Sequence, residues 1–513
     1  MTRTPTPSAS GTGAQPKGAA TEEPRARSDG NRPAVSASRR TVLAWATYDW
    51  ANSAFATVVI AGFFPVFFKQ FWAAGLPVTE STFWLGMTNT LGSALVVLSA
   101  PLLGALADQL GARKGFLLVF TALGVIATGA LWLVAQGHWG LALGLYLLGL
   151  LGFSGSNIFY DALLVVVARP GDYNRVSALG YALGYLGGGL LFALNVLMTL
   201  FPAHFGFADA GEAVRAAFLG VAAWWALFAV PLALWVREPD GRGDRPLGEA
   251  ARAAFRELRQ TLREIRQRRD AFLFLLAYWC YIDGVDTIVH MAVDFGLAIG
   301  LAADGLMVAL LITQFVGFPS ALAFGWLGER WGAKRGILLA IGVYALVVLF
   351  AAGMTRVEEF YAMAVVIGLV QGGIQALSRA LFAGFVPPGR EAEFFGFYNM
   401  LGKFAAVLGP GLVGVAALVT GDPRLSLLPI LLLFLLGALL LWRVRGCRGS
   451  PPLPPGGSHR VGAPPRRPPA STRRSEVAAE PLLQNRAITL KQRTPHVWHR
   501  RRGRIAQHHP DPG

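Results

Sequence analysis

The sequence predicts an all-α polytopic membrane protein whose twelve transmembrane helices form two six-helix bundles. Of its 513 residues, 54% are hydrophobic and 15% are charged, a balance that water-soluble domains do not show. Twelve apolar stretches are long enough to cross a hydrocarbon core of about 30 Å, which takes about 20 helical residues. A motif of glycines and charges also recurs at the same place in each half, which indicates a duplicated unit.

The predicted spans form two sets of six, and the longest polar interruption separates them. The N-terminal bundle, residues 41–236, holds spans at about 42–68, 83–107, 115–136, 140–167, 176–201 and 214–236. The C-terminal bundle, residues 271–445, holds spans at about 271–298, 304–328, 336–354, 360–385, 394–419 and 425–444.

The linker between the bundles, residues 237–270, carries ten arginines. Its apolar residues recur at helical spacing with arginines between them: Ala251, Ala254, Phe255, Leu258, Leu262 and Ile265. This pattern predicts a basic amphipathic helix on the anionic cytoplasmic leaflet. A solvated linker helix held by salt bridges is the alternative.

The net charge of +16 lies almost entirely in the two tails. Residues 1–40 contribute +4 and residues 446–513 contribute +10, so the hydrophobic body is nearly neutral. Both tails are rich in Pro, Gly, Ser and Arg with little apolar periodicity, so we expect them to be disordered. Anionic lipids are the expected partner of the basic tails and linker, and no nucleic acid is expected.

The distribution of Lys and Arg predicts the orientation of the helices. With the N-terminus inside, the cytoplasmic connections hold 20 of the 26 bases of the body, and the opposite side holds four. Positive charge accumulates on the cytoplasmic side, so both termini are predicted to be cytoplasmic. The composition, rich in Ala, Gly and Arg, indicates a bacterial cytoplasmic membrane, and a vacuolar membrane is the alternative.

The motif that recurs follows the second span of each half. Its two copies match position by position without a gap: Gly104, Asp108, Gly111, Arg113 and Lys114 against Gly325, Glu329, Gly332, Lys334 and Arg335. Glycines allow a tight turn close to neighbouring helices, while the acid can cap a helix N-terminus and meet bases across the interface between the halves. We therefore expect both loops to act in gating.

A second match indicates that the halves are related beyond this loop. Three residues of the first half recur at one constant spacing in the second: Pro170, Gly171 and Gly184 against Pro388, Gly389 and Gly402. The motif itself resembles the signature Gly-x-Leu-Ala-Asp-x-x-Gly-x-(Arg/Lys)-(Arg/Lys) of the major facilitator superfamily. That resemblance covers about residues 42–445 and implies a major facilitator fold, a central cavity and alternating access.

Three further segments resemble the vacuole-effluxer branch of this superfamily: Trp45 to Phe55 (WATYDWANSAF), Ser177 to Tyr181 (SALGY) and Phe394 to Lys403 (FFGFYNMLGK). Fungal members of that branch are linked to the release of amino acids from the vacuole. The resemblance thus implies a secondary transporter that exports a small polar solute such as an amino acid.

Polar residues within the first span are candidates for the transport pathway, because charges inside a membrane are costly and tend to face a cavity or a partner. Asp49 has Asn52 and Ser53 three and four positions on, which places three polar groups on one helical face beside Tyr48. We expect this face to line the cavity.

The seventh span carries a polar stripe of Asp283, Asp286 and His290. At 1.5 Å per residue from Ala271, Asp283 lies about 18 Å deep, near the middle of the membrane. A buried aspartate beside a histidine can relay a proton, so a proton is a candidate coupling ion. Structural hydrogen bonds between helices explain the stripe equally well.

Asp161 and Arg379 stand at equivalent places in the two halves, because they have the same spacing as Pro170 and Pro388. This pair can form a cytoplasmic gate or hold the two charged groups of a zwitterion; a permanent structural ion pair is the alternative. Lys403, within the eleventh span, is a second candidate partner for Asp161 or Asp49.

The sequence argues against other functional classes. It has no phosphate-binding Gly-rich loop and no nucleophile motif on a strand-to-helix turn, so neither ATP hydrolysis nor an enzyme is expected. Its histidines and cysteines lack ligand spacing, so no metal and no cofactor are expected. The alternative to a monomeric transporter of a small molecule is a transport-inactive receptor or scaffold that acts through its cytoplasmic tail.

Overall fold

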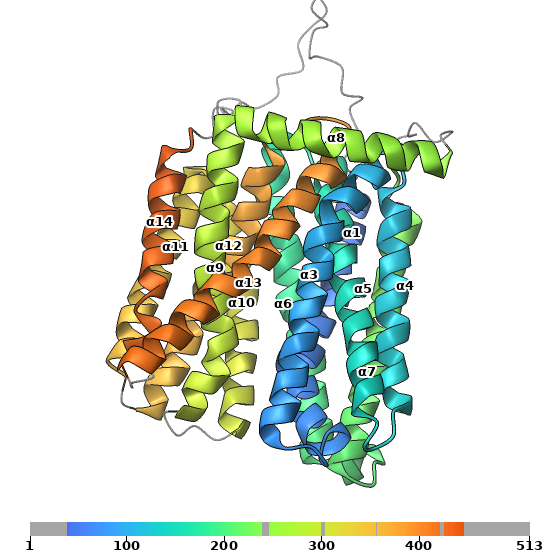
Figure 1. The fold of residues 1–513 in the computed structure, drawn as a ribbon, viewed down its shortest axis with the longest axis vertical. Helices are drawn as coiled ribbons and strands as arrows, with labels where there is room; N and C mark the ends of the chain where they lie inside the picture. Colours follow the sequence, from blue (N-terminus) through green and yellow to red (C-terminus); the bar gives the residue numbers. More distant parts are fainter. Residues whose placement is uncertain (1–37, 239–245, 299–302, 355, 421–424, 446–513) are drawn as a thin grey trace, which may run out of the picture. The chain divides into compact units, whose positions relative to one another are not determined.

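The computed structural model describes residues 38–238, 246–298, 303–354, 356–420 and 425–445. Within these ranges all regular structure is helical, and the long helices run side by side (Figure 1). Ten of these helices are long and apolar enough to cross a membrane. The prediction of an all-α polytopic protein is therefore confirmed. Apart from residues 38–40, the predicted tails lie outside the described residues.

The first half supplies six long helical segments. The first segment is built from α1 (Arg39–Ala54), η1 (Phe55–Phe63), α2 (Phe64–Phe67) and η2 (Phe68–Trp72). The others are α3 (Val78–Leu110), α4 (Arg113–Ala130), α5 (Trp139–Val167), α6 (Tyr173–Leu200) and α7 (Ala210–Trp235). Because η1 and η2 are π-helical, the turns of the first segment are wider there, and its side chains point in directions that a regular α-helix would not give.

The second half begins with α8 (Leu247–Gln267), the amphipathic helix of the linker, and continues with α9 (Arg269–Ala298), α10 (Ala303–Trp331), α11 (Ala333–Ala352), α12 (Val357–Ala383), α13 (Glu391–Thr420) and α14 (Ile430–Arg443). Of the helices after α8, α13 and α14 are not among the ten candidate spans, and α14 has only 14 residues. The count of twelve spans therefore remains a prediction.

The two ends of the helical bundle differ in what covers them. At one end α1 begins, α14 ends and α8 lies across the neighbouring helices (Figure 1). We call this the linker end. At the opposite end, the far end, the first segment finishes at η2, and α10 and α12 begin.

The most extensive contacts between the halves are made by two pairs of helices, α3 with α13 and α6 with α10, and smaller ones by α6 with α12 and α5 with α13. Glycines allow this close packing near the linker end. A Cβ at Gly104 would collide with the carbonyl group of Ala392, and one at Gly396 would lie 2.6 Å from the carbonyl oxygen of Ala100. In the other pair, Gly325 packs in the same way against Ala178.

Stacked aromatic rings fill the interior of each half. Phe64 stacks on Tyr146 with ring centroids 3.9 Å apart, which holds α2 against α5. Tyr278 stacks on Tyr398 at 4.2 Å, which holds α9 against α13. These stacks hold helices of the same half together, and the cavity described next lies between the halves.

Candidate functional site

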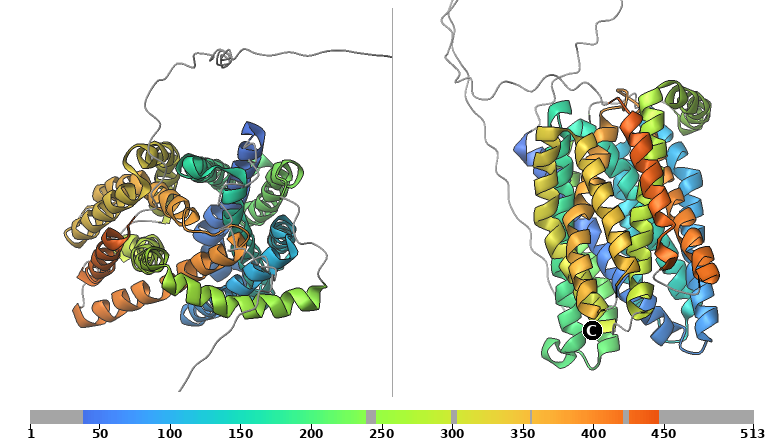
Figure 2. Two further views of the ribbon diagram at one scale, coloured as in Figure 1. Left: turned by 90° about the horizontal axis from the view of Figure 1, so that it is seen from above. Right: turned by 90° about the vertical axis from the view of Figure 1, so that its left-hand side faces the viewer.

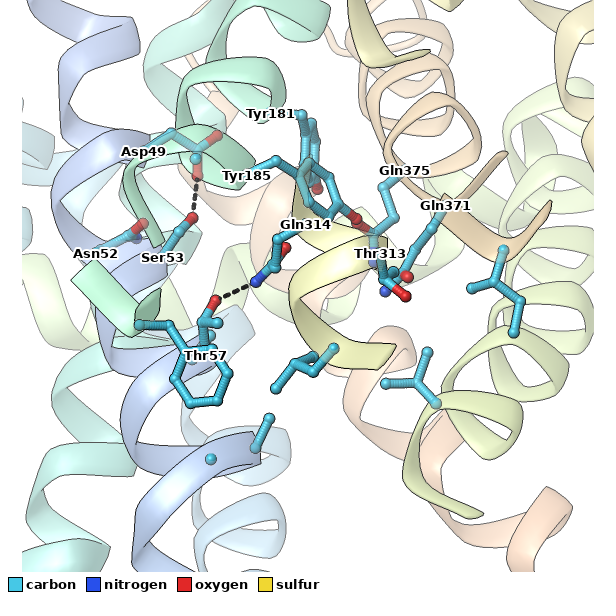
Figure 3. A pocket seen from close by; sticks show the side chains of 18 of the residues that line it. Asp49, Asn52, Ser53, Thr57, Tyr181, Tyr185, Thr313, Gln314, Gln371 and Gln375 are labelled. Atoms are coloured by element: carbon cyan, nitrogen blue, oxygen red, sulfur yellow. Dashed lines mark hydrogen bonds between the residues drawn. The ribbon is translucent and has the colours of Figure 1, made fainter. Parts of the chain in front are cut away.

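A cavity of about 550 Å³ lies between the two halves and is lined by residues from both. Hydroxyl and amide groups form part of its wall, among them Ser53, Thr57, Gln371 and Gln375 (Figure 3). Toward the far end the lining becomes apolar: Val66, Leu306, Met307, Phe360 and Met363. The cavity therefore has a polar inner part and an apolar outer part.

The innermost wall contains a cluster of three charges from three helices. The Arg379 side chain of α12 donates from Nη1 to Oδ1 of Asp161 on α5 at 3.1 Å. Its Nη2 lies 3.7 Å from Oδ2 of Asp49 on α1. Arg379 is only 1% exposed, so this cluster joins the first half to the second away from bulk water. We call it the charge cluster.

Neighbouring groups occupy the rest of the Arg379 guanidinium. Nε donates to Oγ of Ser177 and Nη2 donates to the Ser177 carbonyl, both at 2.9 Å. Three aromatic rings lie beside the guanidinium carbon, with centroids 5.0 Å away for Trp45, 5.2 Å for Tyr160 and 4.2 Å for Tyr181. Three of the five N–H groups of Arg379 thus donate to protein atoms of the first half, and this bonding holds the halves together.

The two aspartates of the cluster differ in their surroundings. Asp161 accepts a second hydrogen bond from Nδ2 of Asn399 at 3.0 Å, in addition to the one from Arg379. Asp49 accepts only from neutral hydroxyl groups at close range, from Ser53 at 3.3 Å and from Tyr160 at 3.2 Å. With both carboxylates ionised, the cluster carries one excess negative charge, and Asp49 is the carboxylate less completely neutralised.

Some predicted site residues line this cavity, and others do not. Asp49, Asp161 and Arg379 line it together with Asn52, whose amide donates to Oδ1 of Asn157 at 2.6 Å. Tyr48 instead points into the first half, where its hydroxyl lies 2.6 Å from Oγ1 of Thr121. The prediction that Tyr48 shares the cavity face was wrong, because its position on α1 faces α4.

Asp283, in the polar stripe of α9, does not line the described cavity. Asp283 is fully buried and accepts a hydrogen bond from the backbone of Gly409 on α13 at 3.0 Å. Within the described lining, α9 contributes Tyr278 and Val289 rather than Asp283 or Asp286. The helical rotation that presents Tyr278 to the cavity turns Asp283 toward α13. The side chain of His290 lies outside the described part.

The alternative pairing of Lys403 is also corrected by the structure. The described ion pairs of Asp49 and Asp161 are both with Arg379. Lys403 is half-buried on α13 and lies within electrostatic range of Asp286 on α9. Its charge therefore acts within the second half.

The first copy of the repeated motif connects the two halves at the linker end. The carboxylate of Asp108 accepts hydrogen bonds from the backbone N–H groups of Ala392 at 3.1 Å and Glu393 at 2.8 Å. These groups lie in the first turn of α13, where the helix dipole favours a negative charge. Arg113 donates to Asp108 at 2.6 Å and to Glu391 at 2.5 Å. We call these contacts the latch.

The second copy makes a different set of contacts. Glu329 and Arg335 are exposed, whereas Lys334 donates to the carbonyl groups of Trp442 and Val444 at the end of α14. The matching contact in the first half is made by Lys114, which donates to Ala233 and Val236 at the end of α7 (2.9–3.1 Å). Both lysines satisfy carbonyl groups at a helix C-terminus.

A difference of one residue in the turn explains this asymmetry. Gly111 and Gly332 both have positive φ, at 61° and 88°, but α4 begins two residues after its glycine and α11 begins immediately after. Lys114 and Lys334 are therefore each the second residue of their helix, and Arg113 has no basic counterpart. Only the first copy is thus built to close the latch.

Neutral and distant partners of the site were not predicted from the sequence. Tyr160, Ser177 and Asn399 complete the charge cluster, yet such groups are common in apolar helices and carry no charge to mark them. Glu391 pairs with Arg113, which is far away in the sequence. A weak signal was present, since Ser177 and Asn399 lie within the segments that resemble the vacuole effluxers.

Comparison with known proteins identifies the family. The family described as "Vacuole effluxer Atg22 like" matches the chain over residues 73–174 and 170–451. The chain belongs to this family. A relative of this Atg22-like transporter is the uncharacterized MFS-type transporter YxiO of Bacillus subtilis, which is 38% identical over 399 residues, 77% of this chain and 93% of YxiO.

Fungal relatives match less of the chain. Autophagy-related protein 22-2 of Aspergillus clavatus is 27% identical over 268 residues, 47% of this chain and 43% of the fungal protein. Autophagy-related protein 22-1 of Aspergillus niger is 27% identical over 54% of this chain and 48% of its own length. The Atg22-like chain therefore spans less than half of these fungal relatives.

Solved structures confirm the major facilitator fold. The human organic anion transporter MFSD10 (TETRAN) superposes with a TM-score of 0.60 at 17% identity and covers 79% of this chain and 99% of its own. FucP, a major facilitator superfamily transporter in the outward conformation, gives 0.62 at 13% identity over 79% and 98%. Together with the family match, this fold makes the Atg22-like chain a multi-pass membrane transporter.

Proposed function

We propose that this transporter exports a small polar solute such as an amino acid, and that the solute binds in the cavity between the halves. The observation that carries this proposal is the incompletely neutralised carboxylate of Asp49 at the polar inner wall. An ammonium group suits that carboxylate, while the amide groups of Gln371 and Gln375 suit a carboxylate of the solute. The apolar outer lining suits a hydrocarbon side chain.

Alternating access is the proposed mechanism. The charge cluster and the latch close the linker end, and the cavity extends toward the far end. With the linker end on the cytoplasmic side, as the Lys and Arg distribution predicts, this arrangement corresponds to an outward-open state. Opening to the cytoplasm then requires Arg379 to leave Asp161, and Asp108 to leave the start of α13.

A proton is the proposed coupling ion. A single excess negative charge at Asp49 can be neutralised by a solute ammonium or by a proton, but not by both. Competition of this kind couples inward movement of a proton to export of the solute. The proposed location is the cell membrane, with both termini in the cytoplasm.

Counterflow in proteoliposomes tests this function. The purified chain is reconstituted with an unlabelled amino acid inside, and uptake of the same labelled amino acid is measured over a panel of amino acids. We expect uptake above that of empty liposomes for at least one amino acid, and loss of uptake in Asp49→Asn. Glu80→Gln, which removes an exposed acid at the far end of α3, is the matched control.

Two outcomes would contradict the proposal. If no member of the panel is taken up by folded protein, the substrate class is wrong. If Asp49→Asn transports as well as Glu80→Gln, then Asp49 is not the binding carboxylate.

A further inference from the structure

The linker helix α8 lies across the linker end with one face packed on the bundle. Ala250, Ala254, Thr261 and Ile265 are buried on that face, and α8 contacts α3 and α9. Seen from above, α8 runs along the edge of the bundle and outside the other helices (Figure 2, left). The side of α8 that faces away from the bundle is therefore not covered by the described helices.

The outward side combines arginines with large apolar residues. Phe255, Arg259, Leu262 and Arg266 follow at i, i+4, i+7 and i+11 and share one face of the helix. Phe255 is 63% exposed and Leu262 is 44% exposed. Arg252 and Arg263, which are also exposed, flank this stripe. We call these six residues the basic face.

The arginines of the basic face lie close to one another, and none of them pairs with a described acid of α8. Arg259 and Arg263 are four residues apart, as are Arg252 and Arg256, and like charges at this spacing destabilise a helix. Among the described side chains, no arginine of α8 forms an ion pair with an acid, and Glu264 points instead toward Arg390.

We propose that the basic face docks on anionic lipid headgroups at the membrane surface. Guanidinium groups bind lipid phosphates, and each base near the surface contributes favourably to binding. Phe255 and Leu262 would enter the boundary between headgroups and acyl chains, which explains why a polar linker exposes them. The position of α8 beside the helix ends places this face at the depth where those headgroups lie.

Docked lipid also reinforces the latch, a step that rests on the proposed closure at the linker end. Glu264 accepts from Arg390 at 2.6 Å, and Arg390 donates to Glu393 at 3.0 Å. The backbone N–H of Glu393 donates in turn to Asp108. An α8 that is held on the membrane surface therefore holds the start of α13 in its closed position.

Hydrogen exchange of the full chain in lipid nanodiscs tests the docking. Exchange of α8 amides is compared between phosphatidylcholine alone and a mixture in which a third of the lipid is phosphatidylglycerol. We expect exchange at least about tenfold slower in the mixture. The variant Arg252→Gln/Arg259→Gln/Arg263→Gln/Arg266→Gln should lose this difference. The control Arg500→Gln/Arg501→Gln/Arg502→Gln/Arg504→Gln removes the same charge from the tail and should keep it.

Equal exchange of α8 in the two membranes would overturn the docking, as would a lipid effect that survives in the variant or disappears in the tail control. Glu264→Gln tests the connection to the latch separately. In that variant, amide exchange of α8 should still depend on the lipid composition. Amide exchange at the start of α13 should no longer depend on it. If exchange at residues 391–398 still depends on the lipid in Glu264→Gln, the connection between α8 and the latch is wrong. The docking of α8 on lipid would not be affected by that result. Neither readout depends on which solute is transported.

Discussion

Arg379 places a full positive charge between the halves, away from water. Removing a guanidinium from water is costly, and Asp161, Asp49 and Ser177 offset that cost. Because these partners come from α1, α5 and α6 while Arg379 comes from α12, the pairing exists only while the inner ends of these helices are together. The charge cluster therefore forms only when the two halves are closed at the linker end.

Replacing Arg379 should destabilise the protein strongly. In Arg379→Gln the carboxylates of Asp161 and Asp49 lose their counterion, which for a buried pair costs about 3–5 kcal/mol. The thermal unfolding midpoint in detergent measures this. In the double variant Asp161→Asn/Arg379→Gln one uncompensated charge is removed, so part of the stability should return. If the losses of stability in the two single variants simply add up in the double variant, the side chains of Asp161 and Arg379 are not coupled.

Gly104 provides a second test at this scale. A methyl group at Gly104 would collide with the Ala392 carbonyl, whereas one at Gly86, on the same helix, would meet nothing within 4 Å. Gly104→Ala should therefore lower the unfolding midpoint by forcing α3 from α13. Gly86→Ala should leave it unchanged or raise it, because alanine favours the helix by about 1 kcal/mol. Equal midpoints for the two variants would contradict the close packing of α3 on α13.

The sequence predicted only part of the site at this scale. Asp161 and Arg379 could be paired in advance, because the internal repeat placed them at equivalent positions of the two halves. Asp283 and Tyr48 were misplaced because spacing shows which residues share a helical face but not where that face points. Tyr160 contributes a hydrogen bond without charge, so nothing in the sequence distinguished it from other polar residues in the helices, and Ser177 was marked only by its place in a segment that resembles the vacuole effluxers.

Among the elements, the two loops of the repeated motif share a sequence but not a structure. In the first copy Asp108 caps α13, whereas in the second copy the equivalent Glu329 is exposed. The sequences align without a gap, so the one-residue shift of the helix start could not be seen in them. The π-helical turns of η1 and η2 were equally hidden, because Phe55–Phe63 has the composition of an ordinary apolar helix.

Asp108→Asn and Glu329→Gln should therefore have unequal effects. Asp108→Asn removes the charge that caps α13 and pairs with Arg113, so hydrogen exchange of residues 391–398 should become about tenfold faster, equivalent to about 1.4 kcal/mol. Glu329→Gln removes an exposed acid and should leave the equivalent first turn of α6 unchanged. Similar acceleration in both variants would show that the loops act symmetrically after all.

At the scale of the whole molecule, hydropathy and the internal repeat were sufficient to predict the fold class. Each predicted apolar stretch has about the length needed to cross the bilayer. The duplicated motif relates the two halves to each other, so errors in single helix boundaries do not change the predicted fold class. The count of twelve spans remains a prediction, since α14 is only 14 residues long. The conformation could not be predicted, because one sequence must be compatible with every state of a transport cycle.

Distances between paired spin labels across the two ends of the bundle test whether the halves alternate in opening these ends. One pair, Gly115→Cys and Arg335→Cys, spans the linker end, and the other, Gln136→Cys and Glu358→Cys, spans the far end; all four positions are exposed. Cys280 and Cys447 are replaced in both backgrounds. Adding Asp108→Asn/Arg113→Gln breaks the latch without requiring a known solute. In this double variant we expect the distance across the linker end to lengthen and the distance across the far end to shorten. A longer linker-end distance with an unchanged far end, or no change at either end, would contradict alternating access through this latch.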